Sequence, residues 1–137
     1  MLFHCDQVVA SPAARFSTPF TQLGLVPEGA SSLLAPRLMG HQRVFSLLVL
    51  GRPMNAATAL ACGLVSSIAD DVAAASTAVA REISGLPAEA VKLSRRLLRG
   101  EPEDIVKRMN DEAALFAQRM RSPEAVAAFN AFLSRKK

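Results

Sequence analysis

Residues 51–65 read GRPMNAATALACGLV, and this stretch decides the fold. Gly51 fits the position after the end of one helix, Asn55 is a good N-cap for the next helix, and Gly63 fits the end of that second helix. The small residues between them allow close packing of the backbone before a strand. The stretch therefore specifies a packing arrangement and carries no residue of reaction chemistry.

Short strands and helices surround this stretch. Short β-branched runs that end at Pro or Gly predict strands, whereas apolar residues three or four positions apart predict helices. The expected strands lie at 6–10, 14–17 and 64–68. The expected helices lie at 30–39, 40–50 and 56–62. The first of these helices is expected to end or kink near Pro36, because proline lacks the N–H that a helix interior uses.

From Asp70 onward the apolar periodicity is helical. Breaks at 85–87, 100–102 and 122–123 each pair a helix terminator with a helix starter. The four apolar stripes between these breaks are Val72, Ala75, Val79 and Ile83; Ala90, Leu93 and Leu97; Ile105, Met109, Ala113, Phe116 and Met120; and Val126, Phe129 and Leu133. Because a few short strands do not make a stable sheet alone, the chain resembles part of a larger α/β arrangement.

The composition fits one globular domain. The chain has 137 residues, of which 50% are hydrophobic and 20% charged, and this balance excludes a disordered chain. The net charge is +4, but the basic residues are dispersed, so a nucleic-acid surface is not expected. The longest apolar run, at 44–50, is too short to span a bilayer, and no signal peptide is visible.

The cysteines and histidines suggest no metal site. Cys5 and Cys62 lie far apart and fit reduced thiols in a cytoplasmic protein. His4 and His41 have no companion acids or cysteines at ligand spacing, so both are interpreted as structural or surface residues.

A single acid in an apolar loop is the candidate chemical group. Glu28 lies between Pro27 and Gly29, just before the helix expected at 30–39, and the loop residues before it are nearly all apolar or small. A carboxylate held in such a loop can transfer a proton. The alternative is a solvated acid that favours the N-terminus of the helix. Two serines at positions 31 and 32 are interpreted as helix caps.

Three segments resemble the crotonase superfamily, which contains enoyl-CoA hydratases and isomerases. They are CDQVVAS at 5–11 with the following FSTP and LG, the stretch at 51–65, and AFLSRK at 131–136. The second segment is similar to the family signature G-x-x-x-x-A-x-x-A-x-x-x-G-L-V. The resemblance implies an α/β crotonase-like (ClpP/crotonase) fold in which 1–137 is the C-terminal half of the domain. Residues 1–69 would form the end of the core with the active-site loop, and 70–137 a helical region.

The same resemblance implies that a family N-terminal half precedes the segment beginning at Met1. That half supplies most of the sheet and both N–H groups of the oxyanion hole. Family hydratases use two carboxylates to hold and activate water. One would fall before Met1 and the other at Phe20, which is not an acid. The hydratase interpretation therefore lacks both residues in this chain, and the sequence leaves open whether the chain is active alone.

Glu28 matches the position at which isomerases resembling the peroxisomal Δ3,Δ2-enoyl-CoA isomerases carry their carboxylate. The resemblance implies a parent enzyme in which Glu28 moves a proton of an acyl-CoA thioester, with no cofactor beyond the coenzyme A of the substrate. One alternative is a non-catalytic crotonase-like module for acyl-CoA binding or assembly, and a second is an enoyl-CoA hydratase.

The resemblance also implies contacts to the substrate and between subunits. The expected substrate contacts are Phe20, Leu23, Leu25, Phe132, Arg135 and Lys136. The apolar members would line an acyl pocket, although core packing would use them equally well. The two basic residues would meet coenzyme A phosphates, with a frayed tail as the alternative. Family members form trimers or dimers of trimers, so a homo-oligomer that contacts neither nucleic acid nor membrane is expected.

Overall fold

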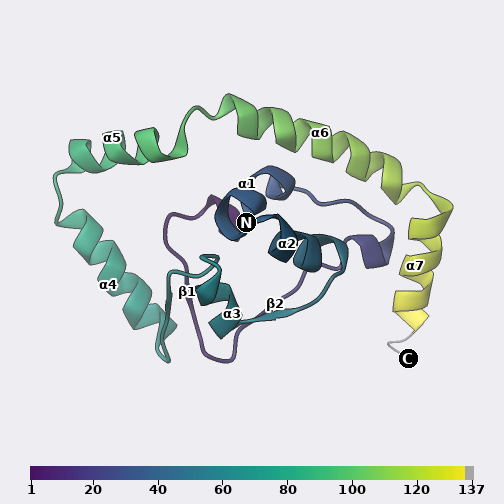
Figure 1. Cartoon of the computed structure of the whole chain (residues 1–137), viewed down its shortest axis with the longest axis horizontal. Helices are drawn as coiled ribbons and strands as arrows, with labels where there is room; N and C mark the ends of the chain where they lie inside the picture. Colours follow the sequence, from purple (N-terminus) through teal and green to yellow (C-terminus); the bar gives the residue numbers. More distant parts are fainter. Residues whose placement is uncertain (135–137) are drawn as a thin grey trace.

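The computed structural model describes residues 1–134, in which four C-terminal helices arch around an N-terminal body (Figure 1). The arch consists of α4 (Val72–Ser84), α5 (Ala88–Arg99), α6 (Glu103–Met120) and α7 (Pro123–Ser134). The body contains the helices α1 (Ser31–Met39), α2 (His41–Val44) and α3 (Ala56–Ala61), the 3-10 turns η1 (Leu2–His4) and η2 (Thr21–Leu23), and the π-helical segment η3 (Phe45–Val49). Contacts of α6 with α1 and of α7 with η2 join the arch to the body.

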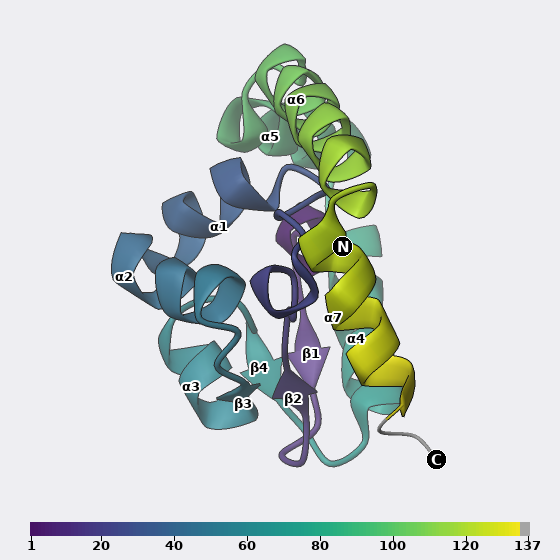
Figure 2. The ribbon, with the colours of Figure 1, turned by 90° about the vertical axis from the view of Figure 1, so that its right-hand side faces the viewer.

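Two short ladders connect segments far apart in the body. β1 (Val9–Ala10) pairs in parallel with β4 (Ser67–Ile68), and β2 (Arg15–Phe16) pairs antiparallel with β3 (Met54–Asn55). The register places Val9 opposite Ser67 and Arg15 opposite Asn55. Helix α3 packs against β3 and β4, and α4 packs against β1, so the ladders lie between these two helices (Figure 2). The residues that follow η3 are thereby fixed beside the N-terminal strands.

The strands are shorter than the sequence predicts. Residues 6–10 and 64–68 form a strand only at their last two positions, and residues 14–17 only at the middle two. A strand extends only as far as its hydrogen-bonded neighbour, and in both ladders the pairing covers two residues on each side. The strand β3 is not predicted at all, because two residues show no periodicity.

The helix of the stretch 51–65 and the glycines at its two ends are as predicted, whereas the strand β3 within it is not. Gly51 and Gly63 have positive φ values of 62° and 82°, as expected for glycines at helix ends. The side-chain oxygen of Asn55 accepts a hydrogen bond of 2.8 Å from the Thr58 N–H and caps α3. Helix α3 ends one residue before the predicted end, and its buried alanines bring its backbone close to the core.

The apolar core lies where α1, η3 and α3 meet. Its buried side chains include Ala35, Met39, Leu47, Leu48, Ala59, Cys62, Leu64 and Val65. Helix α1 does not end at Pro36 but continues to Met39, where Gly40 stops it. The helix predicted for 40–50 is divided into α2 and the π-helical η3. All the buried side chains of this core cluster therefore come from the body.

The helices of the arch begin and end close to the predicted breaks. Asp71 caps α4 by accepting a hydrogen bond of 2.8 Å from the Ala74 N–H. The apolar stripes are only partly covered, since Leu93 and Leu97 of α5 are 51% and 85% exposed. Leu98, beside this stripe, is 88% exposed. Among residues 1–134, no helix has the length and hydropathy of a membrane span.

Candidate active site

Glu28 lies between η2 and α1, where it lines an apolar groove of about 760 Å³. The groove runs between this loop, the N-terminal segment and α6. The Glu28 carboxylate is exposed, and it has no hydrogen-bond or ion-pair partner among the residues that the structure describes. The carboxylate is therefore free to act on a molecule bound in the groove.

Helix α6 forms an apolar wall of this groove. It contributes Ile105, Met109, Ala113, Phe116, Ala117 and Met120. These residues recur every three or four positions and so lie on one face of the helix. They include the whole apolar stripe that the sequence predicts for this helix. The N-terminal body contributes Phe3, His4, Thr18, Phe20 and Ser31, and Glu28 is the single acid in the described lining.

A buried carboxylate on α6 holds the start of α1, and sequence patterns do not reveal it. Glu112 has only 5% of its surface exposed. Its two oxygens accept hydrogen bonds from the N–H groups of Ala30, at 2.6 Å, and Ser32, at 2.9 Å. The Ser32 hydroxyl donates a third bond at 2.5 Å, and Arg108 donates to that hydroxyl at 3.1 Å. These bonds replace the water that a buried charge loses.

Glu112 therefore satisfies two of the backbone N–H groups at the N-terminus of α1. Backbone N–H groups at a helix start lack partners within the helix and attract negative charge. Glu112, and not Glu28, accepts the hydrogen bonds from the N–H groups of Ala30 and Ser32. Glu28 is exposed just before this helix, so the interpretation as a solvated acid stays open beside the catalytic one. The predicted serine caps are wrong: Ser32 bonds to Glu112, and the buried Ser31 hydroxyl has no partner within residues 1–134.

A second group of contacts holds the Glu28 loop from the N-terminal side. The Nε2 of His4 donates a hydrogen bond of 2.7 Å to the carbonyl oxygen of Gly29. Arg99 of α5 donates in turn to the His4 carbonyl oxygen at 2.5 Å. His4 has the structural role that the sequence indicates, and it links α5 to the loop.

Asp6 fastens the same N-terminal segment to α5. Its two carboxylate oxygens accept hydrogen bonds of 2.7 Å from Arg95 and from Arg99. Partial burial raises the pKa of Asp6, but the hydrogen bonds from the two arginines and their positive charges lower it by more. The net pKa of Asp6 is below its ordinary value, so the ion pair is present at neutral pH.

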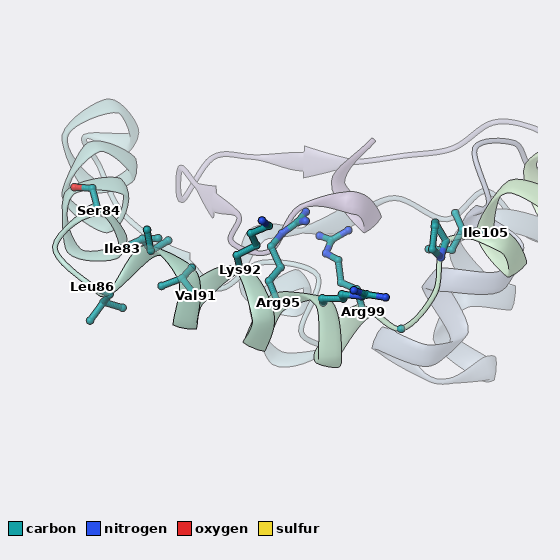
Figure 3. Close-up of a pocket in the computed structure, with 12 residues that line it drawn as sticks. Ile83, Ser84, Leu86, Val91, Lys92, Arg95, Arg99 and Ile105 are labelled. Carbon is teal, nitrogen blue, oxygen red and sulfur yellow. The ribbon is translucent and has the colours of Figure 1, made fainter.

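A second cavity, of about 740 Å³, lies between the end of α4, α5 and the start of α6 (Figure 3). Lys92, Arg95 and Arg99 point from α5 toward the N-terminal segment. Asp6 forms ion pairs with both Arg95 and Arg99. The two arginines therefore attach α5 to the N-terminal segment and are not unpaired charges for a ligand. Ile105 lines both cavities, so they are neighbours. In the described part of the chain, no three His, Cys, Asp or Glu side chains could hold a metal ion.

The structure brings only some of the predicted substrate contacts together. Phe20 is half-buried and lines the groove with Glu28. Leu23, Leu25 and Phe132 do not line it; Leu25 is buried, and Phe132 on α7 is 50% exposed. Arg135 and Lys136 lie outside the described residues. The sequence therefore locates the acid and one apolar neighbour, whereas the α6 wall and Glu112 emerge only from the tertiary arrangement.

A comparison with family models matches residues 1–137 to the model described as "Enoyl-CoA hydratase/isomerase". The chain belongs to this family. The resemblance to the crotonase superfamily that the sequence predicts is thereby confirmed.

Curated members of the enoyl-CoA hydratase/isomerase family show which relatives the chain is similar to. It is 33% identical over 134 residues to human "Enoyl-CoA delta isomerase 2", a match that covers 96% of this chain and 34% of the human protein. It is 31% identical over 134 residues to mouse "Enoyl-CoA delta isomerase 3, peroxisomal", covering 96% of this chain and 42% of the mouse protein. The chain thus spans less than half the length of these relatives.

A solved member of the family confirms the crotonase-like fold. The enoyl-CoA hydratase/isomerase from Pseudoalteromonas atlantica T6c matches with a TM-score of 0.93 and 41% sequence identity. The match covers 98% of this chain and 55% of the solved chain. The arch of helices around a body with few short strands is therefore the arrangement of this portion of the crotonase fold.

Proposed function

We propose that the full-length protein is an enoyl-CoA isomerase that converts a 3-enoyl-CoA into the conjugated 2-enoyl-CoA, with Glu28 as its only base. The observation that carries this proposal is the free Glu28 carboxylate, the single acid in the described lining of an apolar groove. The similarity to two proteins named enoyl-CoA delta isomerases supports the same reaction.

The chemistry needs one group that takes and returns a proton. The carboxylate removes a proton from C2, which lies next to the thioester carbonyl, and the electron pair of that C–H bond moves into a dienolate. The carboxylic acid then returns the proton to C4, and the double bond forms between C2 and C3. No atom is gained or lost, so a single carboxylate that reaches both carbons is sufficient as the base, provided that preorganised donors, which the family's N-terminal half supplies, stabilise the dienolate.

The lining of the groove favours this proton shift over hydration. The family resemblance places Phe20 where hydratases carry an acid, and Phe20 lines the same groove as Glu28. Addition of water needs one group that activates the water and another that delivers a proton. The apolar face of α6 provides surface for the acyl chain and disfavours a bound water.

Coenzyme A enters this proposal only as part of the substrate, because a proton transfer needs no additional cofactor. We also propose that the full-length protein forms a homo-oligomer. Support comes from the apolar surface of the arch, where Leu97 and Leu98 are almost fully exposed.

The test is an analysis of products formed by the full-length protein. The protein is incubated with a 3-enoyl-CoA and, separately, with a 2-enoyl-CoA, and the products are separated by chromatography. The proposal expects conversion of the 3-enoyl-CoA to the 2-enoyl-CoA, detected by the absorbance of the conjugated thioester. Formation of 3-hydroxyacyl-CoA as the main product would establish a hydratase instead. Binding of both thioesters without any product would establish a non-catalytic module.

A further inference from the structure

We infer that Glu112 is a positioning residue for Glu28: its buried carboxylate ties the loop that carries the base to α6, the helix that forms the apolar wall of the groove. The inference rests on the proposed function, in which Glu28 is the base. It adds to that reaction a positioning residue that is about eighty residues away in the sequence but in direct contact with the loop.

The contacts of Glu112 lie immediately after the base. Ala30 is two residues beyond Glu28, and its N–H donates to Glu112 at 2.6 Å. Ala30 has a φ of 57°, a left-handed conformation that is strained for a non-glycine residue. A strained residue relaxes when its surroundings no longer hold it. Loss of the Glu112 carboxylate would therefore release the backbone next to Glu28.

The origin of these contacts distinguishes Glu112 from an ordinary helix cap. A cap is commonly supplied by a Ser, Thr, Asp or Asn at the helix start, and this chain has serines there. Instead the acceptor comes from 82 residues away for Ala30 and 80 residues away for Ser32. Arg108, one turn earlier on α6, reaches the Ser32 hydroxyl as a second attachment. The start of α1 is thus attached to α6 through side chains, in addition to the local hydrogen bond of 3.2 Å from the Ser31 N–H to the Glu28 carbonyl oxygen.

The same helix carries the surface on which an acyl chain would lie. Ala113 follows Glu112 directly, and Met109 and Phe116 lie within one turn of it, all three in the groove lining. A shift of α6 would move this wall and the Glu28 loop together. Glu112 therefore sets the distance between the base and the bound acyl chain, on which the reach of the base to C2 and C4 depends.

A carboxylate is required because both of its oxygens are acceptors here. Oε2 accepts from Ala30, and Oε1 accepts from the N–H and the hydroxyl of Ser32. A glutamine has one oxygen and an NH2 group that can only donate. In Glu112→Gln one backbone N–H would face another donor, while the size of the side chain is unchanged.

The experiment compares Glu112→Gln with Asp111→Asn in the full-length protein. Asp111 is the neighbouring acid on α6, exposed and paired with Lys107, so it is a matched control. Steady-state kinetics gives kcat and KM for a 3-enoyl-CoA, and circular dichroism gives the folded fraction. Amide hydrogen exchange is measured at residues 30 and 32. For Glu112→Gln we expect kcat to fall about 10- to 100-fold, as misplacement of a reacting group does, with KM and folded fraction near wild type. Exchange at both amides should accelerate, and Asp111→Asn should behave as wild type.

A second pair of variants carries the test if Glu112→Gln does not fold. Ser32→Ala removes one of the three bonds to Glu112 and the Arg108 attachment, whereas Ser32→Thr retains a hydroxyl. The inference expects a partial loss of kcat in the alanine variant and its recovery in the threonine variant. Equal turnover in the two variants would overturn it.

Three further outcomes are decisive against the inference. Wild-type kcat in Glu112→Gln would show that the loop needs no tether, and a fall in kcat that only follows the folded fraction would show a role in stability alone. Either of these two results for Glu112→Gln leaves the proposed function intact if Glu28→Gln, assayed in parallel, is inactive. Near-wild-type turnover of Glu28→Gln would overturn the proposed function, and with it the role of Glu112.

Discussion

The Nε2 of His4 lies 2.7 Å from the carbonyl oxygen of Gly29, the residue that follows Glu28. The first turn of the chain is thereby attached to the loop that carries the proposed base. Arg99 of α5 holds this turn in place through the His4 carbonyl oxygen. Hydrogen bonds therefore attach the loop to two helices, to α5 through His4 and to α6 through Glu112.

Replacement of His4 tests the first of these attachments. His4→Ala should lower isomerase turnover by up to about tenfold, because a neutral hydrogen bond contributes about 0.5–1.5 kcal/mol. His41→Ala is the matched control, since His41 is exposed and its ring only lies near Phe45, with 6.2 Å between the centroids. Steady-state kinetics of both full-length variants provides the measurement. Equal turnover in the two variants would mean that the His4 bond does not position the loop.

Replacement of Gly24, at the contact between η2 and α7, is predicted to lower the stability of the fold. A Cβ at Gly24 would lie 2.8 Å from the backbone nitrogen of Ala125, so the start of α7 would have to move. Overpacking of this kind typically costs about 1–3 kcal/mol, in addition to the cost of its positive φ.

Gly40→Ala is the matched control for Gly24→Ala. Gly40 also has a positive φ, but a Cβ there would meet nothing within 4 Å. Denaturant unfolding should show a larger loss of unfolding free energy for Gly24→Ala than for Gly40→Ala. Equal losses of unfolding free energy in the two variants would contradict the prediction, because they would show that α7 can move away from a Cβ at Gly24 without loss of stability.

The Asp6 ion pairs predict a specific dependence of stability on pH. The folded-state pKa of Asp6 is below its ordinary value, so the unfolded chain binds this proton more readily. The contribution of the ion pairs is therefore complete above about pH 4 and is lost as the pH falls through the lower, folded-state pKa. Because the Asp6 side chain is 49% exposed, the contribution should not exceed about 1 kcal/mol.

Asp6→Asn measures this contribution. Unfolding midpoints of the wild type and the variant should differ at neutral pH and should converge in acid. High salt should reduce the difference, because exposed charges are screened. A difference that is constant from neutral to strongly acidic pH would contradict the role of the Asp6 carboxylate.

The exposed apolar residues of α5 predict self-association of the 137-residue chain. Leu97 and Leu98 present adjacent apolar surface, and such surface favours contact with another chain. Replacement of both by lysine should lower the sedimentation coefficient at micromolar concentration. A compact monomer already in the wild-type chain would contradict the prediction.

Features with a local cause are the ones that the sequence predicts well. Asn55 caps α3 through a bond to a residue three positions away, and the breaks between the helices of the arch depend on adjacent Gly, Pro and Ser residues. Glu28 is found for the same reason, because an acid among apolar loop residues is visible in the sequence itself.

Features that depend on distant partners are not visible in this way. The lengths of β1 and β4 depend on each other across more than fifty residues, and β3 exists only because β2 lies beside it. Glu112 is one acid among many on an exposed helix until α1 is seen to meet it. The stripe on α6 is predicted correctly as a helix face, but only the tertiary arrangement places Glu28 on the same groove.

The central claim is that Glu28 is the only base, and its most direct test is the turnover of Glu28→Gln in the full-length protein. Glu89→Gln, which changes an exposed acid of α5, is the control. Loss of a general base typically reduces rates about 100- to 10,000-fold, so Glu28→Gln should show such a loss in 3-enoyl-CoA isomerisation while it still binds an acyl-CoA as the wild type does. Turnover close to the wild-type rate in Glu28→Gln would contradict the account.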